Sequence, residues 1–105
     1  MVALTLTRDG HDVIEAVDGA QGLEHARDGR IDLALVDVNM PVMDGITLTR
    51  ELRTLSGYRF TPILILTTES SPARKAEGKE AGATGWLVKP FSPEQLLTVV
   101  RQVLG

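Results

Sequence analysis

The sequence predicts an α/β domain built on a parallel β-sheet, and three observations lead to that class. From Asp12 onward, short apolar runs alternate with longer segments of helical periodicity, which is typical of βα units. Two of the runs, residues 33–36 and 63–66, are apolar at every position, as expected for strands covered by helices on both faces. The segments between the runs carry the start and end signals of helices.

The amino-terminal part of the chain predicts a helix, a strand, a second helix and a second strand. Residues 1–8 resemble the end of a helix that Asp9 and Gly10 close. Residues 12–16 and 32–37 are the first two expected strands. The helix between them is marked by small or apolar residues at helical spacing: Ala20, Leu23 and Ala26.

The rest of the chain predicts three more helices and two more strands, 62–67 and 85–89. Asp44 begins a helix with an apolar face made of Leu48, Leu52 and Leu55. Pro72 opens the next helix, which carries small inward alanines and ends at Gly82. The last helix has an N-cap, a first-turn proline and a capping-box glutamine at Ser92, Pro93 and Gln95.

Composition limits the classes of function. The 105 residues fit one domain, and 43% hydrophobic with 24% charged residues is typical of a globular fold. Acids and bases are interspersed with a net charge of -3, so direct nucleic-acid binding is not expected. There is no cysteine, no secretory signal and no apolar stretch long enough for a membrane span. We therefore expect a cytoplasmic location.

Polar side chains follow three of the expected strands where each strand ends: Asp37, Thr67 and Lys89. The carboxyl ends of parallel strands meet at one edge of a sheet, so an acid, a hydroxyl and an ammonium group converge there. Such an aspartate can attack phosphorus to give an acyl phosphate, with the lysine and threonine as partners for the phosphoryl oxygens. Mg²⁺ would normally bridge the carboxylate and the phosphoryl group.

Residues 35–45, 65–68 and 87–91 together resemble the three signature regions of receiver domains, the phosphoacceptor domains of two-component response regulators. The resemblance implies a single receiver domain over residues 1–105, with a flavodoxin-like, doubly wound sheet. It also implies that a sensor histidine kinase or phosphotransfer protein passes phosphate to Asp37, and that the chain is a signalling domain rather than an enzyme. A downstream protein or output domain would read the phosphorylated state.

The resemblance also assigns roles to individual positions. The backbone carbonyl of Asn39 would join Asp37 in holding Mg²⁺. The phosphoryl group would contact Thr67, Thr68 and Lys89. A cis peptide bond is expected before Pro90, and Asp44 is interpreted as a helix cap. Trp86 occupies the place of an aromatic residue that changes rotamer with the threonine.

The chain departs from the family at its start, where receiver domains have a strand that ends in a metal-binding acidic pair. We therefore expect four strands and about five helices, with weak or absent Mg²⁺ binding. Three arrangements would compensate: direct pairing of the strand at Val13 with that at Leu33, a strand shared between chains, or a rearranged amino-terminal third. A homodimer or higher oligomer through exposed strand edges is expected.

Simpler interpretations stay open beside these. Asp37 and Lys89 could be surface residues, Thr67 a structural strand residue and Trp86 a core aromatic. The alternative function is a phosphorylation-incompetent receiver that acts as an oligomeric interaction module. A small cofactor binder of the flavodoxin type is a third possibility, although residues 19–22 do not match a dinucleotide fingerprint.

Overall fold

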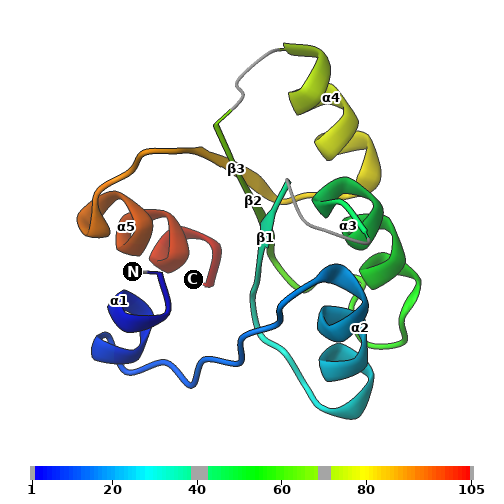
Figure 1. The fold of residues 1–105 in the computed structure, drawn as a ribbon, viewed down its shortest axis with the longest axis horizontal. Coiled ribbons are helices and arrows are strands. Elements are labelled where there is room, and N and C mark those ends of the chain that lie inside the picture. The colour runs from blue at the N-terminus through cyan, green and yellow to red at the C-terminus, as the bar shows by residue number, and fades with distance from the viewer. Residues whose placement is uncertain (1, 39–42, 69–71, 105) are drawn as a thin grey trace.

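The computed structural model describes residues 2–38, 43–68 and 72–104 (Figure 1). Helices and strands alternate after the first two helices, as the sequence predicts. In chain order the elements are α1 (Val2–Arg8), α2 (Gly19–Asp28), β1 (Ala34–Asp37), α3 (Gly45–Thr54), β2 (Ile63–Thr67), α4 (Pro72–Ala81), β3 (Gly85–Val88) and α5 (Pro93–Leu104).

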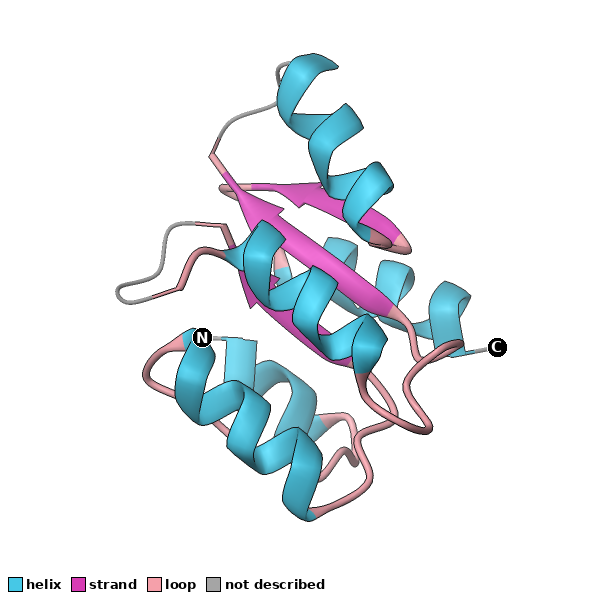
Figure 2. Ribbon diagram, turned by 90° about the vertical axis from the view of Figure 1, so that its right-hand side faces the viewer, coloured by secondary structure: helices cyan, strands magenta, loops and turns pink. Residues whose placement is uncertain are grey.

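The three strands form a parallel sheet in the order β1-β2-β3, which confirms the predicted α/β class. All five residues of β2 are buried because this strand lies between the other two and is covered on both faces. Helices α1 and α5 cover one face, and α2, α3 and α4 cover the other (Figures 1 and 2). The continuous apolar runs of the sequence thus lie at the centre of the molecule.

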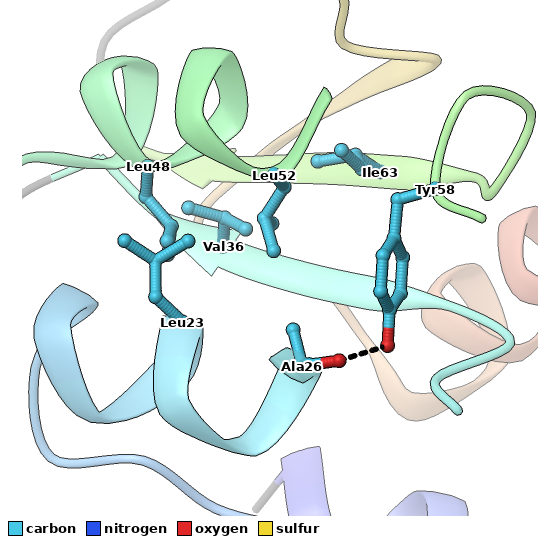
Figure 3. Packing of buried hydrophobic residues seen from close by; sticks show 7 residues of the cluster. All are labelled: Leu23, Ala26, Val36, Leu48, Leu52, Tyr58 and Ile63. Atoms are coloured by element: carbon cyan, nitrogen blue, oxygen red, sulfur yellow. Dashed lines mark hydrogen bonds between the residues drawn. The ribbon is translucent and has the colours of Figure 1, made fainter. Parts of the chain in front are cut away.

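The core is divided by the sheet into clusters on its two faces. On one face α2, α3 and β1 pack together, with Leu23, Leu48 and Val36 among the buried residues (Figure 3). On the other face Leu96 and Val100 of α5 are fully buried with Leu6 of α1 and Leu64 of β2. The apolar face that the sequence predicts for α5 therefore covers the sheet.

The prediction of a strand at residues 12–16 is wrong. Residues 11–16 have no regular secondary structure, and the strand pairing proposed between Val13 and Leu33 is absent from the sheet. Ile14 and Val17 are exposed to 59% and 77%. An apolar run becomes a strand only when a neighbour satisfies its backbone groups, and this segment has no such neighbour in the described sheet.

Several helix ends follow the predicted chemistry. The capping box of α5 is formed, since Ser92 and Gln95 each donate a backbone amide to the other's side-chain oxygen, at 2.8 and 3.1 Å. Gly82 follows α4 with φ of +108°, the left-handed conformation expected of a helix terminator. None of the described helices has the length and apolar character needed to cross a membrane.

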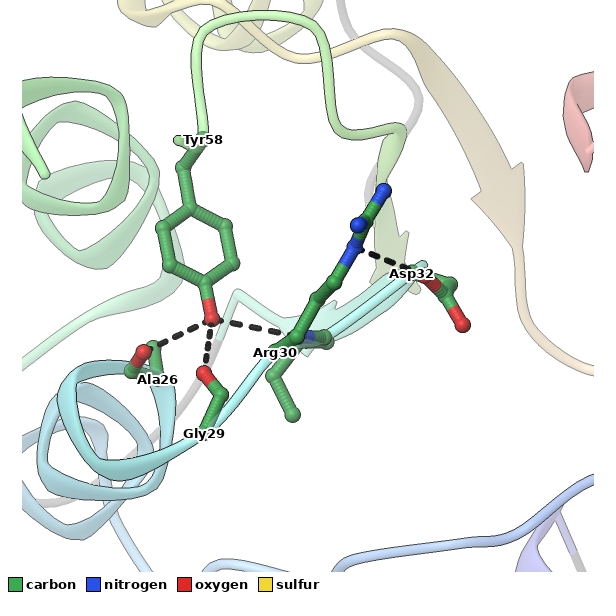
Figure 4. A network of polar contacts seen from close by, with 6 residues as sticks. Ala26, Gly29, Arg30, Asp32 and Tyr58 are labelled. Carbon is green, nitrogen blue, oxygen red and sulfur yellow. Dashed lines mark hydrogen bonds and ion pairs between the residues drawn. The ribbon is translucent and has the colours of Figure 1, made fainter. Parts of the chain in front are cut away.

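Two long-range polar contacts that the sequence gave no sign of tie the loops to the core. The buried Tyr58 hydroxyl lies 2.7 Å from the carbonyl oxygens of both Ala26 and Gly29 and accepts the Ile31 amide (Figure 4). The Arg53 guanidinium donates to the carbonyls of residues on two loops, which include Thr61 at 2.6 Å and Gly82 at 2.7 Å. These contacts fix the loops at the amino ends of the strands.

Candidate functional site

The site lies at the carboxyl edge of the sheet, where the strand register brings the predicted residues together. Asp37 ends β1 and Thr67 ends β2, while Lys89 follows β3 directly. The backbone amide of Lys89 donates to the carbonyl of Thr67 at 2.7 Å, which fixes the start of the following loop to the central strand. The predicted convergence of an acid, a hydroxyl residue and a lysine is therefore present in the fold.

Asp37 and Lys89 form an ion pair across the end of β2, with Nζ of the lysine on Oδ2 of the aspartate. Both side chains are partly open to solvent, at 38% for Asp37 and 34% for Lys89. A carboxylate held beside an ammonium group and reachable from solvent can be approached by a phosphodonor. The same ammonium group is placed to neutralise charge on the modified side chain.

The two threonines at the end of β2 differ in exposure. Thr67 is buried, with 1% of its surface accessible, whereas Thr68 is exposed. The chain thus presents one hydroxyl residue inside the sheet edge and one at its surface. Thr67 lies on the strand between those that carry Asp37 and Lys89.

The amino end of α3 positions the backbone around Asp37. A Cβ atom added to Gly45 would lie 2.5 Å from the backbone oxygen of Asp37 and 2.9 Å from Cα of Val38. Glycine is required at this position because any side chain would push the helix off the end of β1. The backbone amide of Gly45 also donates to the carbonyl of Val38 at 3.2 Å.

Asp44 is the N-cap of α3, and its carboxylate accepts the backbone amide of Thr47 at 2.8 Å. This hydrogen bond lowers the pKa of Asp44 below its usual value, although partial burial acts in the opposite direction. The Asp44 side chain is therefore engaged with the helix backbone. The sequence indicated this cap but not the close approach of Gly45 to β1.

Trp86 of β3 packs against α4. A Cβ atom added to Gly78 would lie 2.6 Å from Cζ3 of Trp86 and 3.0 Å from Cδ1 of Ile65, so the missing side chain leaves the space that the indole fills. The ring packs with a cluster that includes Val38 and Ile65, and its Nε1 is buried without a hydrogen-bond partner. In this structure the Trp86 side chain is part of the packing between the sheet and α4. Residues 69–71, before α4, lie outside the described part.

The described residues offer little to hold a divalent cation. No group of three or more His, Cys, Asp and Glu side chains comes together within the ranges that the structure describes. Asp37 is engaged by Lys89, and Asn39, which the resemblance assigns to the metal, lies outside the described residues. Because Mg²⁺ needs several oxygen ligands, the described side chains do not fit it. The sequence predicted this weakness from the absent acidic pair.

The fold and the site define a class: a parallel, doubly wound α/β domain with a carboxylate and a lysine paired at the carboxyl edge of its sheet. Residues 1–101 match the response regulator receiver domain. The chain belongs to the response regulator receiver domain family, as the sequence predicted.

Curated relatives support this membership. The transcriptional regulatory protein PrrA of Mycobacterium tuberculosis is 38% identical over 94% of this chain, which covers 42% of PrrA. The chain thus spans less than half of such relatives. Protein PilH of Pseudomonas aeruginosa is 35% identical over 95% of the chain, which covers 83% of PilH.

Solved structures show the same fold. Chemotaxis protein CheY4 of Vibrio cholerae has a TM-score of 0.95 and 52% identity, with 98% of this chain and 86% of CheY4 covered. The receiver domain of the sensor histidine kinase PA1611 from Pseudomonas aeruginosa has a TM-score of 0.91 and 31% identity, with 99% and 85% covered. That neighbour has a magnesium ion coordinated in its active-site cleft.

Proposed function

We propose that Asp37 accepts a phosphoryl group from the phosphohistidine of a sensor histidine kinase or phosphotransfer protein. A carboxylate oxygen of Asp37 attacks the phosphorus, the bond to the histidine nitrogen breaks, and an acyl phosphate forms. The observation that carries the proposal is the ion pair between Asp37 and Lys89 at the carboxyl edge of the sheet. The receiver fold supports it, because the family consists of phosphoacceptor domains.

Lys89 and the two threonines are proposed to stabilise the added phosphoryl group. Modification adds negative charge at Asp37, so the Lys89 ammonium group gains a stronger partner at the place it already occupies. Thr68 offers an exposed hydroxyl residue beside the same edge, and Thr67 a buried one. We assign the first contact to Lys89 because it alone of the three contacts the Asp37 carboxylate in a printed geometry of the fold.

Mg²⁺ is proposed to assist the reaction in the family, with Asp37 and the backbone carbonyl of Asn39 as the contributions of this chain. With one paired carboxylate among the described strand ends, we expect much weaker Mg²⁺ binding than in a receiver that has its acidic pair. Self-phosphorylation by small phosphodonors should be correspondingly slow.

Phosphorylation is proposed to bias a partner-binding surface formed by α4, β3 and α5. The packing of Trp86 under α4 supports this location, because a shift at the sheet edge reaches α4 through that ring. The partners would be the kinase and a downstream protein or output domain, in the cytoplasm and without direct nucleic-acid contact. Homodimers or higher oligomers through the strand edges stay a prediction, for which light scattering at high concentration is the test.

The proposal is tested by prolonged incubation with acetyl phosphate and Mg²⁺, followed by peptide mapping in a mass spectrometer. We expect a slowly formed phosphoryl label on Asp37 that is lost in Asp37→Asn and reduced in Lys89→Ala. The matched control is Asp32→Asn, which changes an exposed acid just before the same strand and should keep the label. No labelling at any Mg²⁺ concentration would contradict the proposal and favour the phosphorylation-incompetent interaction module.

A further inference from the structure

The strand β1 forms an edge of the described sheet, and one side of its backbone has no strand beside it. Ala34 and Val38 donate their amides to the carbonyls of Pro62 and Leu66, both at 3.0 Å, on the β2 side. Successive peptide groups of a strand point in opposite directions, so the amides of Leu33 and Leu35 point away from β2. These groups are available to pair with a further strand.

A groove of about 800 Å³ lies along this open edge. Residues 11–16, which were expected to form a strand, line it together with residues 33–36 of the β1 region. Helices wall the groove on both faces of the sheet, through Val2, Leu6 and Val100 on one face and Ala26, Leu48 and Leu52 on the other. The charged residues that line it come from loops, such as Asp12 and Asp32.

The walls of the groove define the chemistry of what would fill it. An occupant beside β1 has to present side chains to an apolar helical layer on each face, so it must be apolar at successive positions rather than alternating. It also has to be extended, because the outward amides and carbonyls of β1 need backbone partners. Both demands are met by an apolar β-strand that continues the parallel sheet.

We propose that this groove binds an extended apolar peptide segment supplied from outside these 105 residues, which adds a strand to the free edge of β1. Main-chain hydrogen bonds would give the affinity, and the two helical walls would select apolar side chains. The proposal is independent of phosphorylation at Asp37. Binding should therefore be unchanged in Asp37→Asn.

A folded second copy fits the groove less well than a free segment. The two runs that are apolar on both faces, 33–36 and 63–66, are already engaged in the chain's own sheet. The exposed segment 11–17 would carry Asp12 and Glu15 into an apolar site, which is costly for charged groups. The solved neighbours also hold more chain than is matched here, since CheY4 of Vibrio cholerae is covered over 86% of its length.

The test uses a fluorescent synthetic peptide with about six consecutive valine, isoleucine and leucine residues between lysines, the length of a typical strand. Its control has proline at the centre, which removes a ladder donor and cannot continue the strand. We expect saturable binding of the first peptide in fluorescence anisotropy, with the proline peptide about tenfold weaker. Equal binding of both peptides, or no binding to the folded chain, would overturn the proposal.

Two matched variants of the protein locate the binding. Leu104 of α5 lines the groove, whereas Leu4 of α1 does not, and both are exposed leucines at 41% and 55%. Leu104→Lys should weaken peptide binding about tenfold by placing a charge on the groove wall, and Leu4→Lys should leave it within about twofold. Equal effects of the two variants would count against the groove as the site.

Hydrogen exchange provides a readout that non-specific adhesion would not change. Bound peptide should slow exchange of the Leu33 and Leu35 amides, because these point to the new strand. Unaltered exchange there despite binding would reject strand addition. A concentration-dependent dimer that protects the same amides without peptide would instead identify a second copy as the occupant and overturn the proposal.

Discussion

At the scale of single residues, the Asp44 carboxylate stabilises the fold in a way that depends on pH. The hydrogen bond from the Thr47 amide lowers the pKa of Asp44, so the folded state favours the charged form. A group with a lowered folded pKa stabilises fully above its unfolded pKa and loses that effect as pH falls through the folded pKa. The contribution of Asp44 should therefore disappear in the acid range below about pH 4.

We expect Asp44→Ala to lower the free energy of unfolding by about 1 kcal/mol at pH 7, and by clearly less near pH 2. Urea denaturation at both pH values measures the difference. Asp32→Ala is the control, because this acid is 81% exposed and its pairing with Arg30 is at the surface. An Asp44→Ala effect of the same size at both pH values would show that the charge of the cap does not contribute.

Tyr58 is the second residue whose role rests on a specific contact. Its hydroxyl joins the end of α2 to the loop before β2, and removal leaves the buried Ala26 carbonyl and the Ile31 amide without this partner. We expect Tyr58→Phe to cost about 1–3 kcal/mol in urea denaturation. Phe60→Leu is the control, because Phe60 lies in the same loop and is 87% exposed, and it should change stability by less than about 0.5 kcal/mol.

At the scale of elements, the packing of α4 on the sheet depends on the absence of a side chain at Gly78. Alanine there would gain up to about 1 kcal/mol in helix propensity. It would also meet Trp86 and Ile65 at 2.6 and 3.0 Å, and such overpacking typically costs about 1–3 kcal/mol. The steric cost should win, because the neighbour is a large ring packed between helix and strand.

We therefore predict that Gly78→Ala destabilises the fold and shifts the fluorescence of Trp86, the single tryptophan of the chain. Gly22→Ala in α2 is the matched control. Its new Cβ would meet its neighbours at 3.7 Å or more, which is ordinary contact, so the helix propensity should prevail and stabilise the protein. If Gly78→Ala also proved stabilising, the indole would have to move freely beneath α4.

At the scale of the whole molecule, local sequence signals predicted what depends on neighbours in the chain. The buried runs 33–36 and 63–66 became central strand residues, and the capping signals of α5 were formed as expected. The acid and the lysine of the site were found because strand ends meet at one edge of a parallel sheet. The strand expected at 12–16 failed because β-structure depends on a partner, which no local pattern can guarantee.

The contacts of Tyr58 and Arg53 could not be predicted for a related reason. Each joins segments that are distant in the sequence, and nothing in the residues around Tyr58 indicates that its hydroxyl will meet the end of α2. The approach of Gly45 to β1 likewise follows from how a helix settles on a sheet rather than from a turn signal. Sequence patterns thus identified the elements and the site, while the closeness of packing required the fold.

The same difference in partners predicts an uneven distribution of stability across the molecule. The strand β2 is paired on both sides and fully buried, so its amides should exchange with solvent only when the chain unfolds globally. The outward amides of Leu33 and Leu35 and those of residues 11–16 should exchange much faster, since no described strand pairs with them. Native-state hydrogen exchange followed by NMR measures both sets in one experiment, and the inward amide of Ala34, bonded to Pro62, is the internal control within the same strand region. Protection of Leu33 and Leu35 as strong as that of β2 would mean that the edge of β1 is already covered in solution.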